Sequence, residues 1–212
     1  LLTAVMSVIA LGSVLLIRGN GSQITVTKKI SFIPTREEMI KVLNKTVIVA
    51  CVINFVGMMI NNGLLGTILP IYVTENVGLP LTQYAWLVSA STVGSVTGNL
   101  IGGAGSDKIG RKKMLMIGFV IGASAIFGLT IFTGFIPLIG MMLLKGIFWG
   151  IVYGVVPAYI ADAVPDEVRG IGIGTFRTFM DMGGLVGPVI MTSIVASFGG
   201  VQGYTYSFYF GA

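Results

Sequence analysis

Long apolar runs alternate with short polar segments along the whole chain. A membrane-spanning helix needs about 20 mostly apolar residues. Five runs have this length: residues 46–74, 83–104, 114–133, 135–161 and 170–198. Shorter apolar runs lie at residues 1–17 and from Tyr204 onward. The pattern therefore predicts five complete spanning helices with a partial span at each end.

The polar segment 18–45 contains the start of one further helix. Thr35 precedes Arg36, Glu37 and Glu38, which is the spacing of a capping box, with Thr35 as N-cap and Glu38 as its reciprocal partner. We predict a short amphipathic surface helix over residues 36–45.

Composition identifies the solvent around these helices. Hydrophobic residues make up 54% of the chain and charged residues only 10%, whereas soluble domains carry about 25% charged residues. A soluble fold of this size could not bury so much apolar surface, so lipid must surround much of it. The predicted fold class is all-α: a polytopic transmembrane helix bundle.

The basic residues indicate the orientation of the chain. Eleven of the 13 Lys and Arg residues fall in segment 18–45, in segment 107–113 and in the turn that ends at Arg169, and the alternate loops contain none. Because Lys and Arg concentrate in short cytoplasmic loops, we expect the 18–45 and 105–113 loops to be cytoplasmic in a multi-pass protein of the plasma membrane. This distribution explains the net charge of +5 without a nucleic-acid partner.

Glycine recurs at every fourth position in several runs, as it does at Gly94, Gly98 and Gly102, and again at Gly146 and Gly150. Such faces let neighbouring helices approach closely. Helix packing is the expected use, and room for a substrate or for helix sliding is the alternative.

The chain offers little for catalysis or metal binding. It has no His, and Cys51, its one cysteine, lies in an apolar run. An intramembrane enzyme would need convergent His, Asp or Ser groups or a metal constellation. We therefore expect no enzyme activity, no metal site and no cofactor.

The most specific segment is 103–113, with sequence GAGSDKIGRKK. Gly110 suits a tight turn between helices. Asp107 could accept hydrogen bonds at a helix N-terminus, and the cations could face lipid headgroups or pair with nearby acids.

This segment resembles the signature loop of the major facilitator superfamily, G-x-L-A-D-R-x-G-R-K/R. Gly103, Asp107, Gly110, Arg111 and Lys112 match, Lys108 is a conservative match, and Gly105 and Ser106 depart from it. The segment from Asp162 to Gly170, followed by the run that ends in Gly187 and Pro188, is similar to the loop and fifth helix of a facilitator half. Lys145 and Gly146 weakly resemble the family's Arg-x-x-x-Gly element.

The resemblance implies a six-helix half built as a 3+3 inverted repeat, preceded by the end of another helix. Residues 1–17 would end helix 6, residues 18–45 would form the cytoplasmic central loop, and residues 46–212 would form helices 7 to 11 and the start of helix 12. It also implies transport of a small solute by alternating access, together with an N-terminal half. The drug/proton antiporter branch looks closest, which implies proton-coupled efflux. The signature loop would then act as a cytoplasmic gate.

Three ionisable residues, Lys145, Arg177 and Asp181, lie inside predicted spans. Each costs about 2.5–3.5 kcal/mol at mid-span, so each is expected to pair or to face a water-filled cavity. Arg177 and Asp181 are four residues apart and could pair on one helix face. A proton-carrying role for Asp181 is the alternative. Lys145 could pair with Asp181 or attract an anionic substrate group.

Polar and aromatic groups mark a candidate substrate cavity. Asn54, Asn61 and Asn62 lie near one helix face, where they could form interhelical hydrogen bonds or line a cavity. Gly63, Gly66 and Pro70 follow and could bend or unwind this helix beside the site. Trp149 and Tyr153 could add an aromatic wall or simply pack.

A non-transporting membrane sensor or assembly subunit on the same scaffold remains the alternative to a transporter. Ligand binding without flux would favour that alternative.

Overall fold

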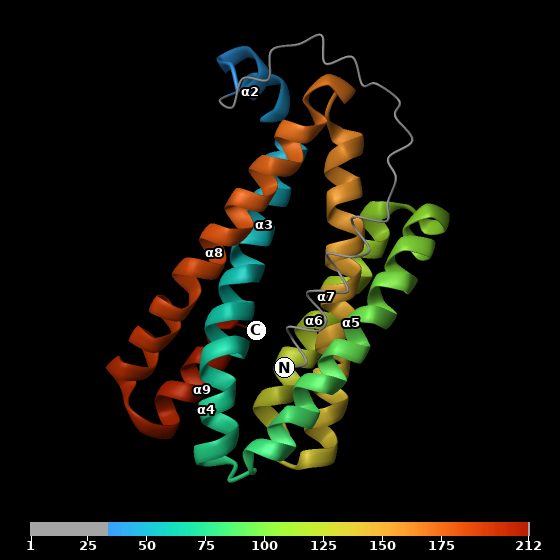
Figure 1. Ribbon diagram of the computed structural model, residues 1–212. Helices are drawn as coiled ribbons and strands as arrows, with labels where there is room; N and C mark the ends of the chain where they lie inside the picture. The colour runs from blue at the N-terminus through green and yellow to red at the C-terminus, as the bar shows by residue number, and fades with distance from the viewer. Residues whose placement is uncertain (1–33, 212) are drawn as a thin grey trace, which may run out of the picture. The chain divides into compact units, whose positions relative to one another are not determined.

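The computed structural model describes residues 34–211, and every secondary-structure element in that range is helical (Figure 1). The elements are α2 (Arg36–Val42), α3 (Lys45–Ile60), η1 (Asn61–Ile68), α4 (Leu69–Ile71), η2 (Tyr72–Asn76), α5 (Leu81–Ile109), α6 (Arg111–Ile131), α7 (Phe135–Ala163), η3 (Asp166–Val168), α8 (Arg169–Phe198) and α9 (Gly200–Gly211). The predicted all-α class is confirmed. The expected span at residues 1–17 lies outside the described residues, as does most of the polar segment after it.

Within residues 34–211, four helical stretches are long and apolar enough to cross a membrane. They are Lys45–Asn76, Arg111–Ile131, Phe135–Ala163 and Asp166–Phe198. Helix α5 also has 29 residues, but it carries Ser, Thr, Asn and Gln along its length and two charges near its end. Large apolar side chains such as Leu100, Ile136 and Leu185 are more than two-thirds exposed, as expected for helices that face lipid.

Helices α5 and α7 pack backbone to backbone along their predicted glycine faces. A Cβ atom at Gly98 would clash with the carbonyl oxygen of Ile147, and one at Gly146 would clash with the carbonyl oxygen of Ser91. The absence of side chains at these positions is therefore what lets the two helices approach so closely. The predicted packing role of the glycines is confirmed here.

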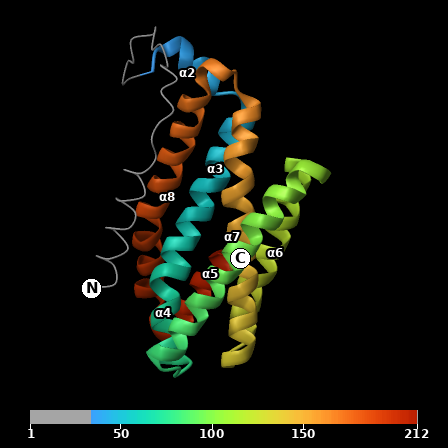
Figure 2. The ribbon, with the colours of Figure 1, turned by 45° about the vertical axis from the view of Figure 1, so that its right-hand side comes forward.

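Helices α3 and α8 form a second close pair, and they lie side by side in both ribbon views (Figures 1 and 2). A Cβ atom at Gly183 would clash with the carbonyl oxygen of Phe55, and one at Gly187 would clash with that of Met59. Glycine contacts thus join α3 to α8 as they join α5 to α7.

The helical stretch Lys45–Asn76 changes its winding where the sequence predicts an interruption. Residues Asn61–Ile68 (η1) and Tyr72–Asn76 (η2) are π-helical, with a short α-helical turn at Leu69–Ile71 between them. The hydroxyl of Thr67 donates to the backbone oxygen of Asn62 at 2.9 Å, five residues earlier. Such π-helical segments, with i→i+5 hydrogen bonds, are frequent at functional sites.

Helix α2 begins at the predicted capping box. The backbone N–H of Thr35 donates to Oε2 of Glu38 at 2.9 Å, and the backbone N–H of Glu38 donates to Oγ1 of Thr35 at 3.3 Å. The helix ends at Val42, earlier than predicted, because Asn44 is the N-cap of the next helix and its Oδ1 accepts from the backbone N–H of Val47.

Candidate functional site

A polar cavity of about 400 Å³ lies between η1, α5 and α7. Each element contributes polar or aromatic groups. They are Asn61 and Asn62 from η1, Tyr84, Ser91, Thr92 and Ser95 from α5, and Lys145, Trp149 and Tyr153 from α7. The volume lies within the range of small-molecule sites, about 300–1,000 Å³.

This cavity brings together five residues that the sequence singled out: Asn61, Asn62, Lys145, Trp149 and Tyr153. The ring centroids of Trp149 and Tyr153 are 5.4 Å apart, so the two rings pack on each other. Both residues also line the cavity, so they form an aromatic wall as well.

Asn54 is the candidate cavity residue that the structure places elsewhere. It is buried, and its Nδ2 donates to the backbone oxygen of Ala50 at 2.9 Å within its own helix. It borders a different cavity, which lies beside the N-terminal half of α3. The amide is satisfied by its own backbone, so it neither bridges helices nor lines the polar cavity.

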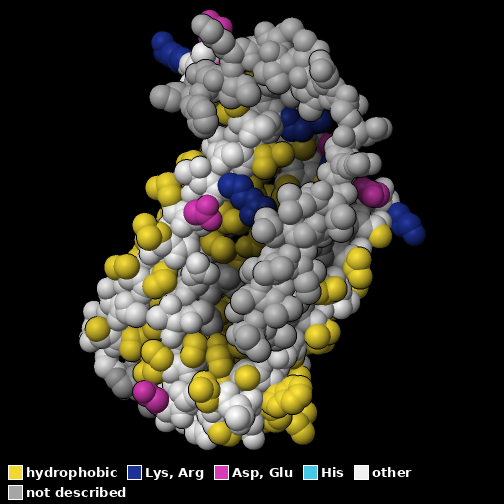
Figure 3. Space-filling view, viewed as in Figure 1, with side chains coloured by type: hydrophobic (Ala, Val, Ile, Leu, Met, Phe, Trp, Pro, Cys, Tyr) yellow, Lys and Arg dark blue, Asp and Glu magenta, His cyan; other side chains and the backbone are white. Residues whose placement is uncertain are grey.

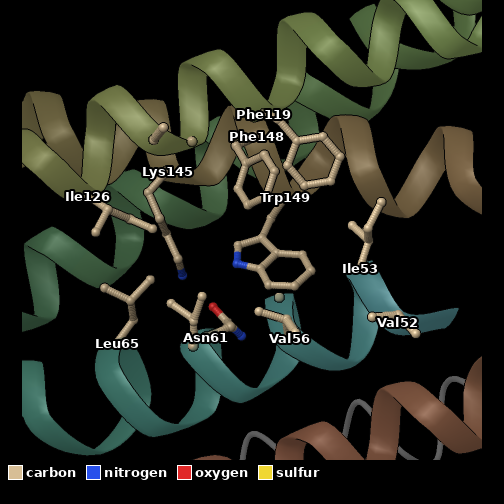
Figure 4. Close-up of a pocket in the computed structure, with 14 residues that line it drawn as sticks. Val52, Ile53, Val56, Asn61, Leu65, Phe119, Ile126, Lys145, Phe148 and Trp149 are labelled. Atoms are coloured by element: carbon tan, nitrogen blue, oxygen red, sulfur yellow. The ribbon is translucent and has the colours of Figure 1, made fainter. Parts of the chain in front are cut away.

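An apolar cavity of about 340 Å³ adjoins the polar one (Figure 4). Asn61, Leu65, Lys145 and Trp149 line both cavities. Figure 4 shows the amine of Lys145, the indole nitrogen of Trp149 and the side-chain oxygen of Asn61 directed into the space between α7 and η1. The polar atoms of three distant sequence positions therefore converge on one place.

Lys145 has a hydroxyl neighbour and no acidic one. Its Nζ lies 3.5 Å from Oγ of Ser91 on α5. Among the residues that the structure describes, no carboxylate lies within ion-pair distance of Lys145, and Asp181 is exposed on α8. The structure therefore does not support an ion pair between Lys145 and Asp181, and it places Lys145 on the wall of the cavity.

Arg177 and Asp181 do not pair either. Both are exposed on α8, and no ion pair joins them in the described part of the chain. The packed face of α8 runs through Phe176, Met180 and Gly183. The two charged residues lie beside that face, where no helix of the described chain covers their side chains, so the expectation of a neutralised pair is not met.

The segment 103–113 is helical on both sides of a single turn residue, whereas the sequence predicts a loop. Helix α5 continues to Ile109, Gly110 alone separates it from α6, and its backbone has φ 92° and ψ 144°. Only glycine adopts such a conformation without strain. The requirement for glycine at this turn is confirmed. We refer to residues 107–113 as the basic turn, and Figure 3 shows the Lys and Arg side chains of the visible face near this end of the molecule.

Within the basic turn, Arg111 has an acidic partner, whereas Asp107 forms no ion pair with any residue that the structure describes. Nη1 of Arg111 lies 3.0 Å from Oδ2 of Asp162 near the end of α7, although it makes no well-aligned hydrogen bond. Asp107 is exposed in the last turn of α5. The N-cap of α6 is Gly110, without a side-chain cap, so the expectation that Asp107 would cap that helix is wrong. Asp107 precedes Gly110 by three residues and still belongs to α5.

The sequence analysis missed several of these contributors. Ser91 and Ser95 are four residues apart and face the cavity from α5, and their spacing was the available signal. The sequence places Asp162 in a family motif and does not indicate that it pairs with Arg111. The sequence also predicts Asn44 within the surface helix, yet its Nδ2 donates to the backbone oxygen of Ala163 at 2.6 Å and so joins α3 to the end of α7.

The fold and the cavity define a multi-pass helical membrane protein with a polar chamber between its helices. Residues 50–212 match the model of the Major Facilitator Superfamily, and the chain therefore belongs to this family.

Curated relatives include three transporters whose names give different substrates. The chain is 32% identical to the sialic acid transporter NanX of Escherichia coli K12 over 136 residues, which are 62% of this chain and 33% of that protein. It is 27% identical to the D-xylose transporter of Levilactobacillus brevis over 142 residues, 66% of this chain and 28% of that protein. It is 34% identical to the multi-drug resistance efflux pump PmrA of Streptococcus pneumoniae over 135 residues, 62% of this chain and 33% of that protein.

These alignments span about a third of each relative's length. The carbohydrate transporters and the efflux pump have similar identities to this chain, so identity alone does not single out the antiporter branch.

Proposed function

We propose that this chain forms one half of a secondary transporter that moves a small solute by alternating access. The observation that carries the proposal is the polar cavity between η1, α5 and α7, which holds Lys145 deep within a membrane helix. In transporters of this kind, substrate sites lie near the bilayer midplane beside interrupted helices. The π-helical stretch Asn61–Ile68 is such an interruption, and it supplies one wall of the cavity.

Alternating access also requires a second half of the transporter. A second six-helix half, the N-terminal half of the transporter, would close the cavity from the opposite side, and the two halves would rock about the substrate. The relatives named above support transport in general. Proton-coupled efflux, as in a drug/proton antiporter, is the form that we propose, because sugar-porter motifs are not evident around the central linker and the fifth helix. The protein would lie in the plasma membrane, with the 18–45 and 105–113 loops in the cytoplasm.

In this proposal the basic turn is the cytoplasmic gate. The gate residues are Gly103, which precedes the basic turn, and Asp107, Lys108, Gly110, Arg111 and Lys112 within it. The ion pair between Arg111 and Asp162 supports this role, because it joins the turn between α5 and α6 to the end of α7. Exposed Asp107 is free to make further contacts during the transport cycle.

The direct test is flux through the complete transporter in proteoliposomes, with and without a pH gradient, over a panel of sugars, sugar acids and cationic drugs. Tyr153→Ala alters the cavity and is expected to reduce flux by about tenfold, a transition-state effect of about 1.4 kcal/mol. Tyr209→Ala is the matched control, because Tyr209 is also exposed but lies on α9, away from the cavity.

Binding of a panel compound without flux under any gradient would contradict the proposal. That outcome would favour a sensor or an assembly subunit on the same scaffold. Flux that is equally reduced by Tyr153→Ala and Tyr209→Ala would contradict the assignment of the cavity.

A further inference from the structure

Lys145 carries the one formal charge on the walls of the two adjoining cavities, as far as described residues line them. At about 1.5 Å per residue, it lies about 15 Å from the first residue of α7 and about 27 Å from the last. The hydrocarbon core of a bilayer is about 30 Å thick. Lys145 therefore lies well inside the length of α7, and its side chain faces the two cavities and not the end of the helix.

A cation at this depth needs a negative partner, and the described chain supplies none. The nearest polar contact is the hydroxyl of Ser91, at 3.5 Å. The two ion pairs of the described residues, Arg111–Asp162 and Arg169–Asp166, involve other side chains at the basic end of the helices. A single neutral hydroxyl compensates little of the cost of desolvating an ammonium group.

Two further polar groups beside Lys145 are also unpaired. Oδ1 of Asn61 is buried and accepts no hydrogen bond, while the Nδ2 of the same amide donates to Oδ1 of Asn62 at 3.3 Å. The indole N–H of Trp149 has no acceptor among the described residues, and it is directed into the cavity, where it can donate to a ligand. All three residues line both cavities, and Figure 4 shows their polar atoms directed into the same space.

These polar groups indicate the chemistry of a ligand that would fit the cavity. The ammonium of Lys145 and the N–H of Trp149 are two donors, and a carboxylate offers two oxygens that accept from charged and neutral donors. Oδ1 of Asn61 is an acceptor and requires a donor on the ligand. The aromatic faces of Trp149 and Tyr153 and the side chain of Leu65 would contact the apolar part of the molecule.

We propose that the cavity binds a small organic anion. Its carboxylate would contact Lys145 and Trp149, and a neighbouring hydroxyl or N–H group would donate to Oδ1 of Asn61. This inference names the substrate class of the transport proposed above and rests on that proposal. It assigns Lys145 as the counter-ion of the substrate and not as a structural charge.

The test is equilibrium dialysis of the complete purified protein against radiolabelled pairs that differ only in charge: lactate and lactamide, and glucuronate and glucuronamide. Lys145→Gln removes the charge at similar length, Lys145→Arg keeps it, and Lys41→Gln is a control that removes an exposed charge from α2. The wild type and Lys41→Gln are expected to bind a carboxylate in preference to its amide. Lys145→Gln is expected to lose at least about tenfold in affinity, with recovery in Lys145→Arg.

Asn61→Leu tests the second contact and is expected to weaken binding of the hydroxylated carboxylates by about tenfold. Three results overturn the anion assignment: amides that bind as well as their carboxylates, a carboxylate affinity that is unchanged in Lys145→Gln, or a panel in which no carboxylate binds the wild type. Flux of neutral solutes alone would overturn this assignment and leave transport standing. Carboxylate binding that requires Lys145, without flux in proteoliposomes, would leave the assignment standing and overturn transport.

Discussion

Nη1 of Arg111 lies 3.0 Å from Oδ2 of Asp162, so that the first residue of α6 is joined to the end of α7. The arginine side chain is 27% exposed and the aspartate side chain 61% exposed. Such partly solvated pairs contribute only about 0–1 kcal/mol to stability. The contact is therefore too weak to hold the fold together, and a reversible latch needs a contact of this strength.

A double-mutant cycle measures this latch. Arg111→Gln and Asp162→Asn, alone and together, are each expected to lower the thermal stability of the purified protein by less than about 1 kcal/mol, with a coupling energy of similar size. In flux assays both single variants should change the transport rate more than they change stability. Additive effects of the two substitutions on flux would show that the pair does not act as a unit.

Asp107→Ala is expected to reduce flux while leaving membrane insertion and thermal stability unchanged. The reason is that Asp107 is exposed and forms no ion pair in the described chain, so its removal breaks nothing in this conformation. Glu167→Ala is the matched control, because Glu167 is an exposed acid in the turn between α7 and α8. Wild-type flux in the Asp107 variant would remove this residue from the gate.

Gly98→Ala is expected to destabilise the protein by about 2 kcal/mol, in the range found for overpacked interiors. The added methyl group would clash with the carbonyl oxygen of Ile147, and backbone cannot move aside as a side chain can. Gly140→Ala, on α7, is the control, because a Cβ atom there meets nothing within 4 Å. Thermal unfolding in detergent measures both. Equal melting temperatures in the two variants would contradict backbone packing between α5 and α7.

Gly110→Ala is expected to cost about 1–3 kcal/mol, because φ 92° with ψ 144° is a conformation that residues with a Cβ atom rarely adopt. The cost is purely conformational, since a Cβ atom at Gly110 would meet nothing within 4 Å. Gly170→Ala faces equally open space without a positive φ and should be neutral. A neutral Gly110→Ala would mean that the turn can relax to another geometry.

Asn44→Ala and Asn44→Asp separate two roles of one side chain. The amide caps α3 through Oδ1 and donates from Nδ2 to the backbone oxygen of Ala163. The alanine variant loses both contacts, and its missing cap alone costs about 0.5–2 kcal/mol. The aspartate variant keeps the cap and places a second oxygen opposite the carbonyl of Ala163, so only the link to α7 is lost. If thermal unfolding shows equal losses in the two variants, the link contributes all of the stabilisation and the cap none.

The sequence by itself determined the helical class, the approximate position of the long helices and the residues that interrupt or turn them. The reason is that these properties depend on local chemistry. Apolar length sets a span in lipid, Thr35 and Glu38 cap a helix within four residues, and Gly110 is required by the backbone at its own position. The glycine faces at Gly98 and Gly187 are equally local, since spacing of four places them on one side of a helix.

Only the tertiary structure decided which polar groups meet. Asn54 and Asn61 look alike in sequence, yet Asn54 donates to its own helix while Asn61 faces the cavity with an unpaired oxygen. Asp181 stood in the sequence as a candidate partner for Lys145, which lies beside Ser91 instead. The rotation and crossing of packed helices select these contacts, and that geometry depends on contacts between residues far apart in the chain. The substrate class inferred for the cavity rests on Lys145, Trp149 and Asn61 meeting there, which no single stretch of sequence contains.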